Sequence, residues 1–444
     1  MDKLRIKELS DKAYSALCGS DFTTAVNCYN EVLTIDPDNS PALHFASILL
    51  NFSGKYRSAY NLLKKLLDKD KCNAEYYVTL SLILKNLDKY EQAVEAIRVA
   101  HQLKPRDPII ISNAAMLLAD ERRYDRAKDA FEIALDINPE IPFIHFNYSL
   151  LLLKIGDFTN GWKEYEWRIP FHYNSQIPTL PNVKDLKDKK IQIMPEQGYG
   201  DFIMFSRYFD LLEKEGAKVF VNCPHAIYKL YDCHYTPRPD YTFGIASLPL
   251  IFNSMPNKPY IKAPGIKKID ENNNFKIGIA TNAVKEINNS AHVILKDEGI
   301  HIVPHPGNLS YYYAFKRSLF NNFFTPIVDM DGVNLYNLQI DVKHDNEKII
   351  NLRHRIGDFS DLADFVDQMD LIITIDTALA HLAGAMGKPV WLLLPYDCDW
   401  RWQTEGERSI WYPSMRIFRQ PKRGDWETIQ TQIIDELKVN LGLI

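Results

Sequence analysis

Residues 371–394 decide the fold of this chain and read Leu371-Ile-Ile-Thr-Ile-Asp376-Thr377-Ala-Leu-Ala-His381-Leu-Ala-Gly384-Ala-Met-Gly387-Lys-Pro-Val-Trp391-Leu-Leu-Leu394. The apolar run 371–375 has the length and the β-branched content of a strand that is buried on both faces, and residues 388–394 predict the next strand. One helix fits between the two strands. A strand, a helix and a second strand in this order are typical of a parallel α/β sheet.

The start of this helix has the features of an anion site. We expect Asp376 to cap it, so that the first free N–H groups lie at the positive end of the helix dipole, where a diphosphate binds well. His381 follows about one turn later and leans back toward that end. The spacing of Ala380, Gly384 and Gly387 predicts a close approach of the helix to the sheet. A self-capped helix above a core histidine explains the same residues, so both interpretations stay open here.

Composition limits the class of protein. A chain of 444 residues that is 46% hydrophobic is long enough for two or three domains with full cores. The net charge of -5, without a long basic run, argues against nucleic acid or an anionic membrane as partner. The sequence has no apolar stretch long enough to cross a membrane, so we do not expect it to insert into one. The six cysteines show no paired spacing, which predicts neither zinc nor a disulfide framework and favours the cytoplasm.

A repeat organises the first third of the chain. Aromatic residues recur every 34 residues, and small residues recur at the same interval three positions later: Phe22, Tyr56, Tyr90, Tyr124 and Phe158, then Ala25, Ala59, Ala93, Ala127 and Gly161. A period of 34 is that of the tetratricopeptide repeat. We predict a repeat domain over residues 1–171, with four full copies from about 6 to 141 and a partial fifth. Its aromatic run Gly161-Trp162-Lys-Glu-Tyr165-Glu-Trp167 is expected to dock onto the next domain of the chain.

Stacked helical hairpins bury a continuous core and leave a concave surface, which in such arrays usually holds a peptide segment or another protein. We therefore expect a protein or peptide partner for the repeats. A solenoid that serves only to form a homo-oligomer, or only as a rigid spacer, is the alternative.

From residue 183 onward strands alternate with helices, which predicts a doubly wound α/β architecture. The expected strands are residues 190–195, 217–223, 275–280, 326–330, 371–375 and 388–394. A proline-rich stretch at 247–264 predicts a boundary between two Rossmann-like lobes, at 183–264 and 275–444, the second closed by a C-terminal helix. Ligands of such sheets bind beyond the carboxyl ends of the strands.

A second motif, Glu196-Gln-Gly198-Tyr-Gly200-Asp201-Phe202, comes directly after the first expected strand of this part. Gly198 and Gly200 allow the backbone N–H groups to approach a ligand, and Asp201 would open the next helix. A helix cap after a tight turn explains the pattern equally well. The missing third glycine argues against a dinucleotide fingerprint.

Together the two motifs resemble the heptosyltransferase-like branch of the GT-B glycosyltransferases. The resemblance is carried by the stretch from Glu196 through Arg207 and by the stretch from Asp370 through Arg401 and Trp402, followed by Trp411-Tyr-Pro and Phe418-Arg-Gln-Pro. The whole chain is similar to bacterial proteins that join tetratricopeptide repeats to such a domain. The resemblance implies transfer of a sugar from a nucleotide-sugar donor, without a metal ion or other cofactor and with inversion.

The resemblance also assigns roles to residues. Asp201 falls on the general base, and the second motif lies around the donor diphosphate, where its helix start and histidine would stabilise the leaving phosphate. Lys316 or Arg317 is the candidate cation, with an ordinary solvated pair as the alternative. The full set of expected donor-binding residues is Gly198, Gly200, Lys316, Arg317, Asp376, Thr377, Ala378, His381 and Arg401. Trp400 and Trp402 either line the donor pocket or belong to the core.

One region departs from the family. After the strand at 275–280 the family has a Trp-x-Gly segment, whereas this chain has Thr281-Asn282-Ala283-Val284. The segment 282–315, with His292, His301, His305 and Tyr311-Tyr-Tyr313, is either a lid, a loop that contacts the acceptor, or a surface insertion without a role. His301 and His305 are too isolated to predict a metal site.

The sequence leaves three functions open. The first is a glycosyltransferase that acts on a protein held by the repeats, so that remote binding energy positions one side chain. The second is a glycosyltransferase for a lipid or polysaccharide. The third is a scaffold with a degenerate transferase domain, because similarity of fold does not establish chemistry.

Overall fold

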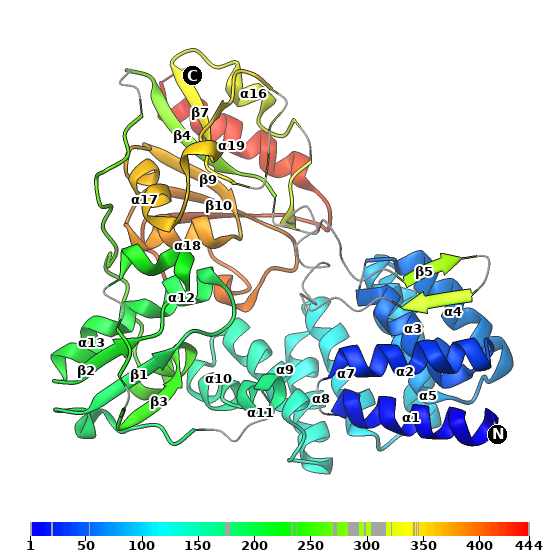
Figure 1. The fold of residues 1–444 in the computed structure, drawn as a ribbon. Helices are drawn as coiled ribbons and strands as arrows, with labels where there is room; N and C mark the ends of the chain where they lie inside the picture. Colours follow the sequence, from blue (N-terminus) through cyan, green and yellow to red (C-terminus); the bar gives the residue numbers. More distant parts are fainter. Residues whose placement is uncertain are drawn as a thin grey trace. The chain divides into compact units, whose positions relative to one another are not determined.

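The chain folds into two compact units (Figure 1). The computed structural model describes residues 2–18, 21–52, 54–173, 178–231, 234–236, 238–269, 273–282, 293–296, 299–302, 317–320, 322–340, 342, 344 and 346–442. The helical unit comprises Met1–Leu151, Trp167–Ser175 and Glu286–Ala314. The α/β unit comprises Leu152–Glu166, Gln176–Lys285 and Phe315–Ile444.

Successive antiparallel hairpins build the helical unit, in which α1 packs on α2, α3 on α4, α5 on α6 and α7 on α8. The recurring alanines Ala25, Ala59, Ala93 and Ala127 are fully buried, which explains the need for a small side chain at that position. The first eight helices are α1 (Asp2–Cys18), α2 (Phe22–Ile35), α3 (Ser40–Phe52), α4 (Tyr56–Lys69), α5 (Ala74–Asn86), α6 (Tyr90–Leu103), α7 (Pro108–Asp120) and α8 (Tyr124–Ile137). The 34-residue period is thus one helical hairpin per copy.

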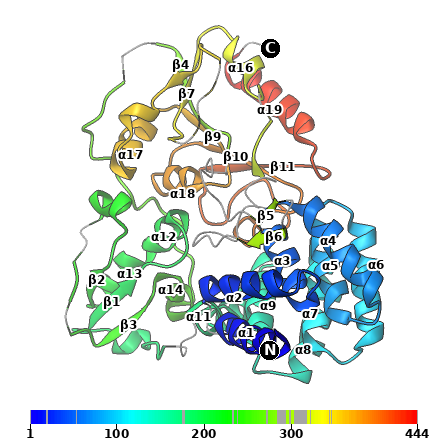
Figure 2. The ribbon, with the colours of Figure 1, turned by 45° about the vertical axis from the view of Figure 1, so that its right-hand side comes forward.

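The end of the repeat array is divided between the units. Next come α9 (Pro142–Lys154), α10 (Phe158–Tyr165) and α11 (Arg168–Tyr173). Residues Leu152–Glu166, which include α10, belong to the α/β unit. Two strands from the insertion, β5 (Val293–Lys296) and β6 (Gly299–Ile302), pair as an antiparallel hairpin and lie beside α3 and α2 within the helical unit (Figure 2).

The first lobe of the α/β unit is a small parallel sheet with the strand order β2-β1-β3. Its strands are β1 (Lys190–Met194), β2 (Lys218–Val221) and β3 (Tyr241–Gly244), and its helices are α12 (Tyr199–Phe205), α13 (Phe209–Lys214) and α14 (Leu248–Phe252). Short 3-10 turns complete it at η1 (Val183–Asp185), η2 (Ser206–Tyr208), η3 (His225–Leu230) and η4 (Ile245–Ser247).

The second lobe is a six-stranded parallel sheet with the order β11-β10-β9-β4-β7-β8. Alternate strand residues form one core with α19, while α17 and α18 lie on the opposite side of the sheet (Figures 1 and 2). Its strands are β4 (Phe275–Ala280), β7 (Val333–Asn337), β8 (Ile350–Asn351), β9 (Leu371–Ile375), β10 (Val390–Leu394) and β11 (Met415–Arg419). Its helical segments are α16 (Thr325–Val328), η5 (Arg353–Arg355), α17 (Phe359–Asp367), α18 (Ala378–Ala385), η6 (Trp400–Trp402) and α19 (Trp426–Asn440).

The expected α/β architecture is therefore present, with errors of detail. Residues 326–330 are not a strand, because Pro326 takes the first turn of α16 and the chain turns again at Gly332 before β7 begins. The sequence also did not predict the strands β3, β5, β6, β7, β8 and β11. The expected absence of disulfides is wrong at Cys223, which is disulfide-bonded.

The aromatic run that ends the repeats docks onto the α/β unit, as the sequence predicted. The Trp162 ring lies edge-on to Trp400, Trp411 and Phe205, with ring centroids 5.4, 6.4 and 6.0 Å away. Gly161 permits the close packing of α10 on α9, because a Cβ there would lie 2.7 Å from the Leu153 side chain. The helix α10 is thus part of the core of the α/β unit.

Membrane spans and metal clusters are both missing from the part of the chain that the structure describes. No helix there is long and apolar enough to cross a membrane. Among the same residues no group of three or more His, Cys, Asp and Glu side chains has the arrangement of a metal site.

Candidate functional site

The first turn of the site follows β1 and opens α12. Gln197 has a φ of 57°, in the left-handed region that residues other than glycine seldom adopt. The Gly198 N–H then donates to Asp201 Oδ2 at 3.2 Å, which closes the start of the helix. The Asp201 side chain remains 16% exposed. This turn holds one carboxylate at the carboxyl end of a parallel strand, where ligands of such sheets bind.

The second turn follows β9 and opens α18, and here the expected cap was wrong. Thr377 rather than Asp376 is the N-cap residue, because its backbone is still extended, with ψ at 173°. Its side chain makes no capping hydrogen bond and lies 3.3 Å from the Thr374 hydroxyl. Asp376 Oδ2 instead accepts from Arg317 Nη1 at 2.9 Å. The first N–H groups of α18, from Ala378 onward, therefore begin a helix end that suits an anion.

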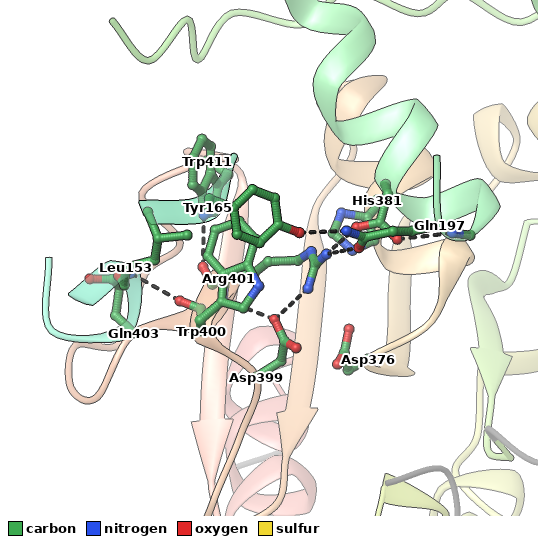
Figure 3. Close-up of polar contacts among 12 residues, drawn as sticks. Leu153, Tyr165, Gln197, Asp376, His381, Asp399, Trp400, Arg401, Gln403 and Trp411 are labelled. Atoms are coloured by element: carbon green, nitrogen blue, oxygen red, sulfur yellow. Dashed lines mark hydrogen bonds and ion pairs between the residues drawn. The ribbon is translucent and has the colours of Figure 1, made fainter. Parts of the chain in front are cut away.

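Arg401, from η6 of the second lobe, reaches the turn of the first lobe (Figure 3). Its Nη2 pairs with Asp201 Oδ1 and donates to Gln197 Oε1 at 3.3 Å. Its Nη1 donates to Asp399 Oδ1 at 2.6 Å, and its guanidinium lies 4.5 Å from the centre of the Trp400 ring. The two lobes thus share one ionic cluster.

The neighbouring carboxylates keep Arg401 of this cluster positively charged. Burial lowers the pKa of the Arg401 guanidinium, but the carboxylates of Asp201 and Asp399 outweigh burial, so that its pKa is raised well above the ordinary value. Arg317 adds a second cation beside Asp376, and its side chain is 27% exposed. Two arginines and three carboxylates therefore meet near the carboxyl ends of β1, β9 and β10.

His381 is buried one turn into α18. Its Nδ1 lies 2.9 Å from the Tyr412 hydroxyl, and its ring stacks on Trp402 with centroids 5.1 Å apart. Burial, reinforced by the positive charge of Arg401, lowers the pKa of His381 to about 3. The ring is therefore neutral near pH 7. It can offer an N–H to an anion but no positive charge.

Close contact between α12 and α18 depends on glycine. A Cβ on Gly200 would lie 2.8 Å from His381 Cδ2, so any side chain there would force the two turns apart. The two glycines of the predicted set, Gly384 and Gly387, have other roles than an approach to the sheet. A Cβ on Gly384 would lie 2.5 Å from the Tyr412 ring, and Gly387 ends the helix with a φ of 74°.

The end of β4, where the chain departs from the family, is held by side-chain amides. Gln339 Oε1 accepts from the N–H groups of Thr281 and Asn282, each at 3.1 Å. Asn282 Oδ1 accepts from the Ser318 hydroxyl at 2.7 Å, which keeps Arg317 near β9. Residues 283–292, 297–298 and 303–316 lie outside the described residues. Lys316, His292, His305 and Tyr311-Tyr-Tyr313 are among them, and the His301 side chain is likewise not described.

The structure brings most of the expected site residues together. The members that form the contacts described above are Gly198, Gly200, Asp201, Arg317, Asp376, Thr377, His381 and Arg401. The sequence did not assign Gln197, Asp399 or Tyr165 to the site, although these residues complete the cluster around Arg401. Asp399 could have been noticed as an acidic residue two positions before Arg401, whereas Tyr165 lies too far away in sequence to be found.

Arg207 is a further residue whose role the sequence did not reveal. It is buried, and its guanidinium donates to the carbonyl oxygens of Pro256 and Trp411 at 2.8 and 2.9 Å. It also lies 4.7 Å from the centre of the Tyr412 ring and donates to the Tyr260 hydroxyl at 3.3 Å. Arg207 therefore ties the first lobe to the second and to the segment that links them.

Comparison with known proteins assigns the two parts of the chain. Residues 343–394, which include β9, α18 and β10, match glycosyltransferase family 9 (heptosyltransferase). Residues 74–107 match the tetratricopeptide repeat. The chain thus has a tetratricopeptide-repeat match in its helical unit and a heptosyltransferase-family match in the second lobe of its α/β unit. The second turn lies within the matched segment 343–394, whereas the first turn and Arg401 lie outside it.

Two curated relatives are similar to parts of the chain. Protein FlbA from Caulobacter vibrioides is 24% identical over 333 residues, which cover 65% of this chain and 53% of FlbA. A BBSome complex member BBS4 homolog from Drosophila melanogaster is 30% identical over 98 residues, 21% of this chain and 20% of that protein. The chain thus spans about half of FlbA and a fifth of the BBS4 homolog.

Two solved structures illustrate the similarity of part of the chain to known folds. The tetratricopeptide protein TTC0263 from Thermus thermophilus is 15% identical and covers 40% of this chain and 93% of its own, with a TM-score of 0.34. The pilF protein of Pseudomonas aeruginosa is 19% identical and covers 42% and 81%, with a TM-score of 0.31.

Proposed function

We propose that this protein is a glycosyltransferase that moves a sugar from a nucleotide-sugar donor to a protein acceptor bound by the repeats. One observation carries the transferase part. The carboxylate of Asp201 in the first lobe is paired with Arg401 of the second lobe, and its helix α12 packs against α18, whose uncapped N-terminus suits a diphosphate. This arrangement provides a base for an acceptor and positive charge for a leaving group at one place.

In the proposed reaction, an acceptor oxygen or nitrogen attacks the anomeric carbon from the face opposite the diphosphate. A new glycosidic bond forms, the bond from the sugar to the diphosphate oxygen breaks, and the configuration inverts. The acceptor proton passes to Asp201, and the nucleoside diphosphate leaves with the electron pair of the broken bond. Because Asp201 already accepts from Gly198 and Arg401, it would hold the acceptor in place and take its proton late.

The leaving diphosphate needs positive charge in place before the bond breaks. The N-terminal N–H groups of α18 and the Arg317 guanidinium supply it in our proposal, and neutral His381 adds an N–H donor. These groups fulfil the electrostatic task that a divalent cation performs in other transferases. We therefore propose transfer without a metal ion or cofactor.

The acceptor part of the proposal rests on the repeats. Four full copies and a partial fifth of a 34-residue period make a surface that in such arrays holds polypeptide. A lipid or polysaccharide acceptor, and a scaffold without activity, are the alternatives that two experiments separate.

The first experiment measures donor binding and turnover. Thermal shifts with UDP, GDP and ADP, and with their sugar conjugates, should identify a donor. The Asp201→Asn variant should then retain donor affinity within a few-fold while turnover falls by about 10²- to 10⁴-fold. Asp210→Asn, an exposed aspartate of α13 in the same lobe, is the matched control and should turn over like the wild type. Absence of any donor would support the scaffold.

The second experiment tests the acceptor. Removal of residues 1–141 should abolish transfer to polypeptide and leave donor hydrolysis intact, with circular dichroism as the check of folding. Transfer to a lipid or polysaccharide that survives this deletion would contradict the protein acceptor.

A further inference from the structure

The last helix of the repeat array takes part in the transfer site through one hydroxyl group. We propose that Tyr165 is a positioning residue that fixes Gln197, and through it Arg401 and Asp201, for the reaction. This inference rests on the proposed function. It makes the end of the repeat array a part of the active site rather than only a support for the acceptor.

Hydrogen bonds connect Tyr165, Gln197 and Arg401 in order (Figure 3), and Arg401 continues the connection to Asp201. The Gln197 Nε2 donates to the Tyr165 hydroxyl at 2.5 Å, and its Oε1 accepts from Arg401 Nη2 at 3.3 Å. The same Nη2 pairs with Asp201 Oδ1. The guanidinium has no acceptor, so the amide oxygen must face Arg401 and the amide nitrogen must face Tyr165. The guanidinium thus sets the orientation of the amide, and the tyrosine hydroxyl holds the amide nitrogen in place.

Gln197 has an unfavourable backbone conformation that its hydrogen bonds must hold in place. Its φ of 57° is costly for a side chain larger than glycine, and such backbone persists only where the surroundings over-determine it. Its amide is anchored at one end by Tyr165 and at the other by Arg401. The residue directly precedes Gly198, whose N–H holds the second oxygen of Asp201. Both carboxylate oxygens therefore depend on the same turn.

The helix that carries Tyr165 is itself rigidly held in the α/β unit. The Leu153 carbonyl accepts from Gln403 Nε2 at 2.9 Å, and Lys154 pairs with Asp397 at 2.5 Å. The Ser247 hydroxyl donates to Glu166 at 2.9 Å, immediately after the helix. These contacts join the segment to both lobes.

The packing of Tyr165 separates the role of its ring from that of its hydroxyl. The residue is 1% exposed, with its ring 5.7 Å from that of Trp162 and 6.0 Å from that of Trp400. Phenylalanine preserves these ring contacts and removes the hydroxyl that accepts from Gln197. A substitution to phenylalanine is therefore a direct test.

The experiment uses full-length protein and a double-mutant cycle. Tyr165→Phe and Gln197→Met, alone and together, are compared in turnover of UDP-, GDP- and ADP-sugars and in affinity for UDP, GDP and ADP. Each single variant should lower kcat about tenfold, which corresponds to the loss of one hydrogen bond, and should leave the Kd of the nucleoside diphosphate within twofold. The double variant should lose no more than either single one, because the two act as a unit.

The matched control is Tyr148→Phe. Tyr148 is 7% exposed, and its hydroxyl donates to Glu132 at 2.8 Å in the helical unit, so it is a buried tyrosine of similar bonding away from the cluster. It should keep the kcat of the wild type. A wild-type kcat for Tyr165→Phe, or effects of the two cluster variants that add, would overturn the positioning role.

Failure of the proposed function gives a different result. Wild-type protein would then turn over none of the nucleotide sugars. The same four proteins are in that case compared by tryptophan-monitored unfolding of the α/β unit. If the effects of the two variants on stability do not add, Tyr165 and Gln197 act as one unit, as proposed. If the effects add, the positioning role of Tyr165 is overturned in this case too.

Discussion

The two turns of the site have the same elements, a strand end, a helix start and an aspartate bound to an arginine, but differ in which groups remain available to a ligand. Each follows a buried parallel strand, opens a helix and carries an aspartate bound to an arginine that is distant in sequence. In the first turn both oxygens of Asp201 are occupied, by Gly198 and by Arg401 from the other lobe. In the second turn Asp376 binds Arg317 of its own lobe, and the N-cap side chain leaves the helix start uncovered. The first turn fixes a carboxylate, whereas the second presents N–H groups.

The largest expected effect concerns the arginine that belongs to both lobes. Arg401→Gln should lower kcat/KM about a hundredfold, because it leaves the partly buried carboxylates of Asp201 and Asp399 without their cation. The control is Arg416→Gln, which removes a bidentate salt bridge to Glu436 elsewhere in the α/β unit. Steady-state kinetics decide the prediction. Activity of Arg401→Gln within threefold of the wild type would contradict the role assigned to the pair.

A smaller and different effect is expected in the second turn. Arg317→Gln should raise the Kd of the bound nucleoside diphosphate about tenfold, as expected for one charge-assisted hydrogen bond, and should change kcat less than Arg401→Gln does. Calorimetric titration measures this. A variant with normal affinity and a low kcat would reverse the contrast between the two turns.

The histidine of the second turn predicts a dependence of stability on pH. The pKa of His381 is about 3 in the folded protein and about 6.5 in an unfolded chain. Its neutral burial therefore contributes stability that is fully present above pH 6.5 and is lost as the pH falls toward 3, by at most about 1.4 kcal/mol per pH unit. His381→Gln should flatten this slope in denaturant unfolding measured from pH 7 to 5. His101→Gln, an exposed histidine of α6, should retain the wild-type slope.

The smallest effect is expected at an exposed contact between the lobes. Lys229 Nζ lies 2.7 Å from Asp358 Oδ2, with the lysine side chain 69% exposed. Partial burial raises the pKa of Asp358, but the hydrogen bonds from Lys229, from Ser360 and from the backbone outweigh it and lower that pKa to about 2. The contribution is present above about pH 4 and is lost as the pH falls through 2. Lys229→Met should lower Tm by only about 1–2 °C at pH 7. A larger drop would show that this pair matters as much as the buried one.

Much of the fold could be predicted because periodic sequence patterns and local apolar runs indicate its helices and strands. Buried residues that recur every 34 positions, such as Ala59 and Ala93, mark the repeats, and β-branched runs mark the central strands β4 and β9. The errors occurred where local cues compete. Pro326 stands among apolar residues that fit a strand but starts a helical turn. Asp376 is a residue type that often caps helices, but its carboxylate accepts a hydrogen bond from Arg317 instead.

The sequence by itself determined which residues stand at the ends of the strands, since glycine, aspartate and threonine after an apolar run are local signals. Only the tertiary structure decided how those residues are paired. Arg401 meets Asp201 across 200 positions of sequence, and Tyr165 reaches Gln197 from a helix that belongs by sequence to the repeats. The physical reason is that a buried charge must find a partner of opposite charge wherever the fold places one, and sequence spacing does not encode that distance.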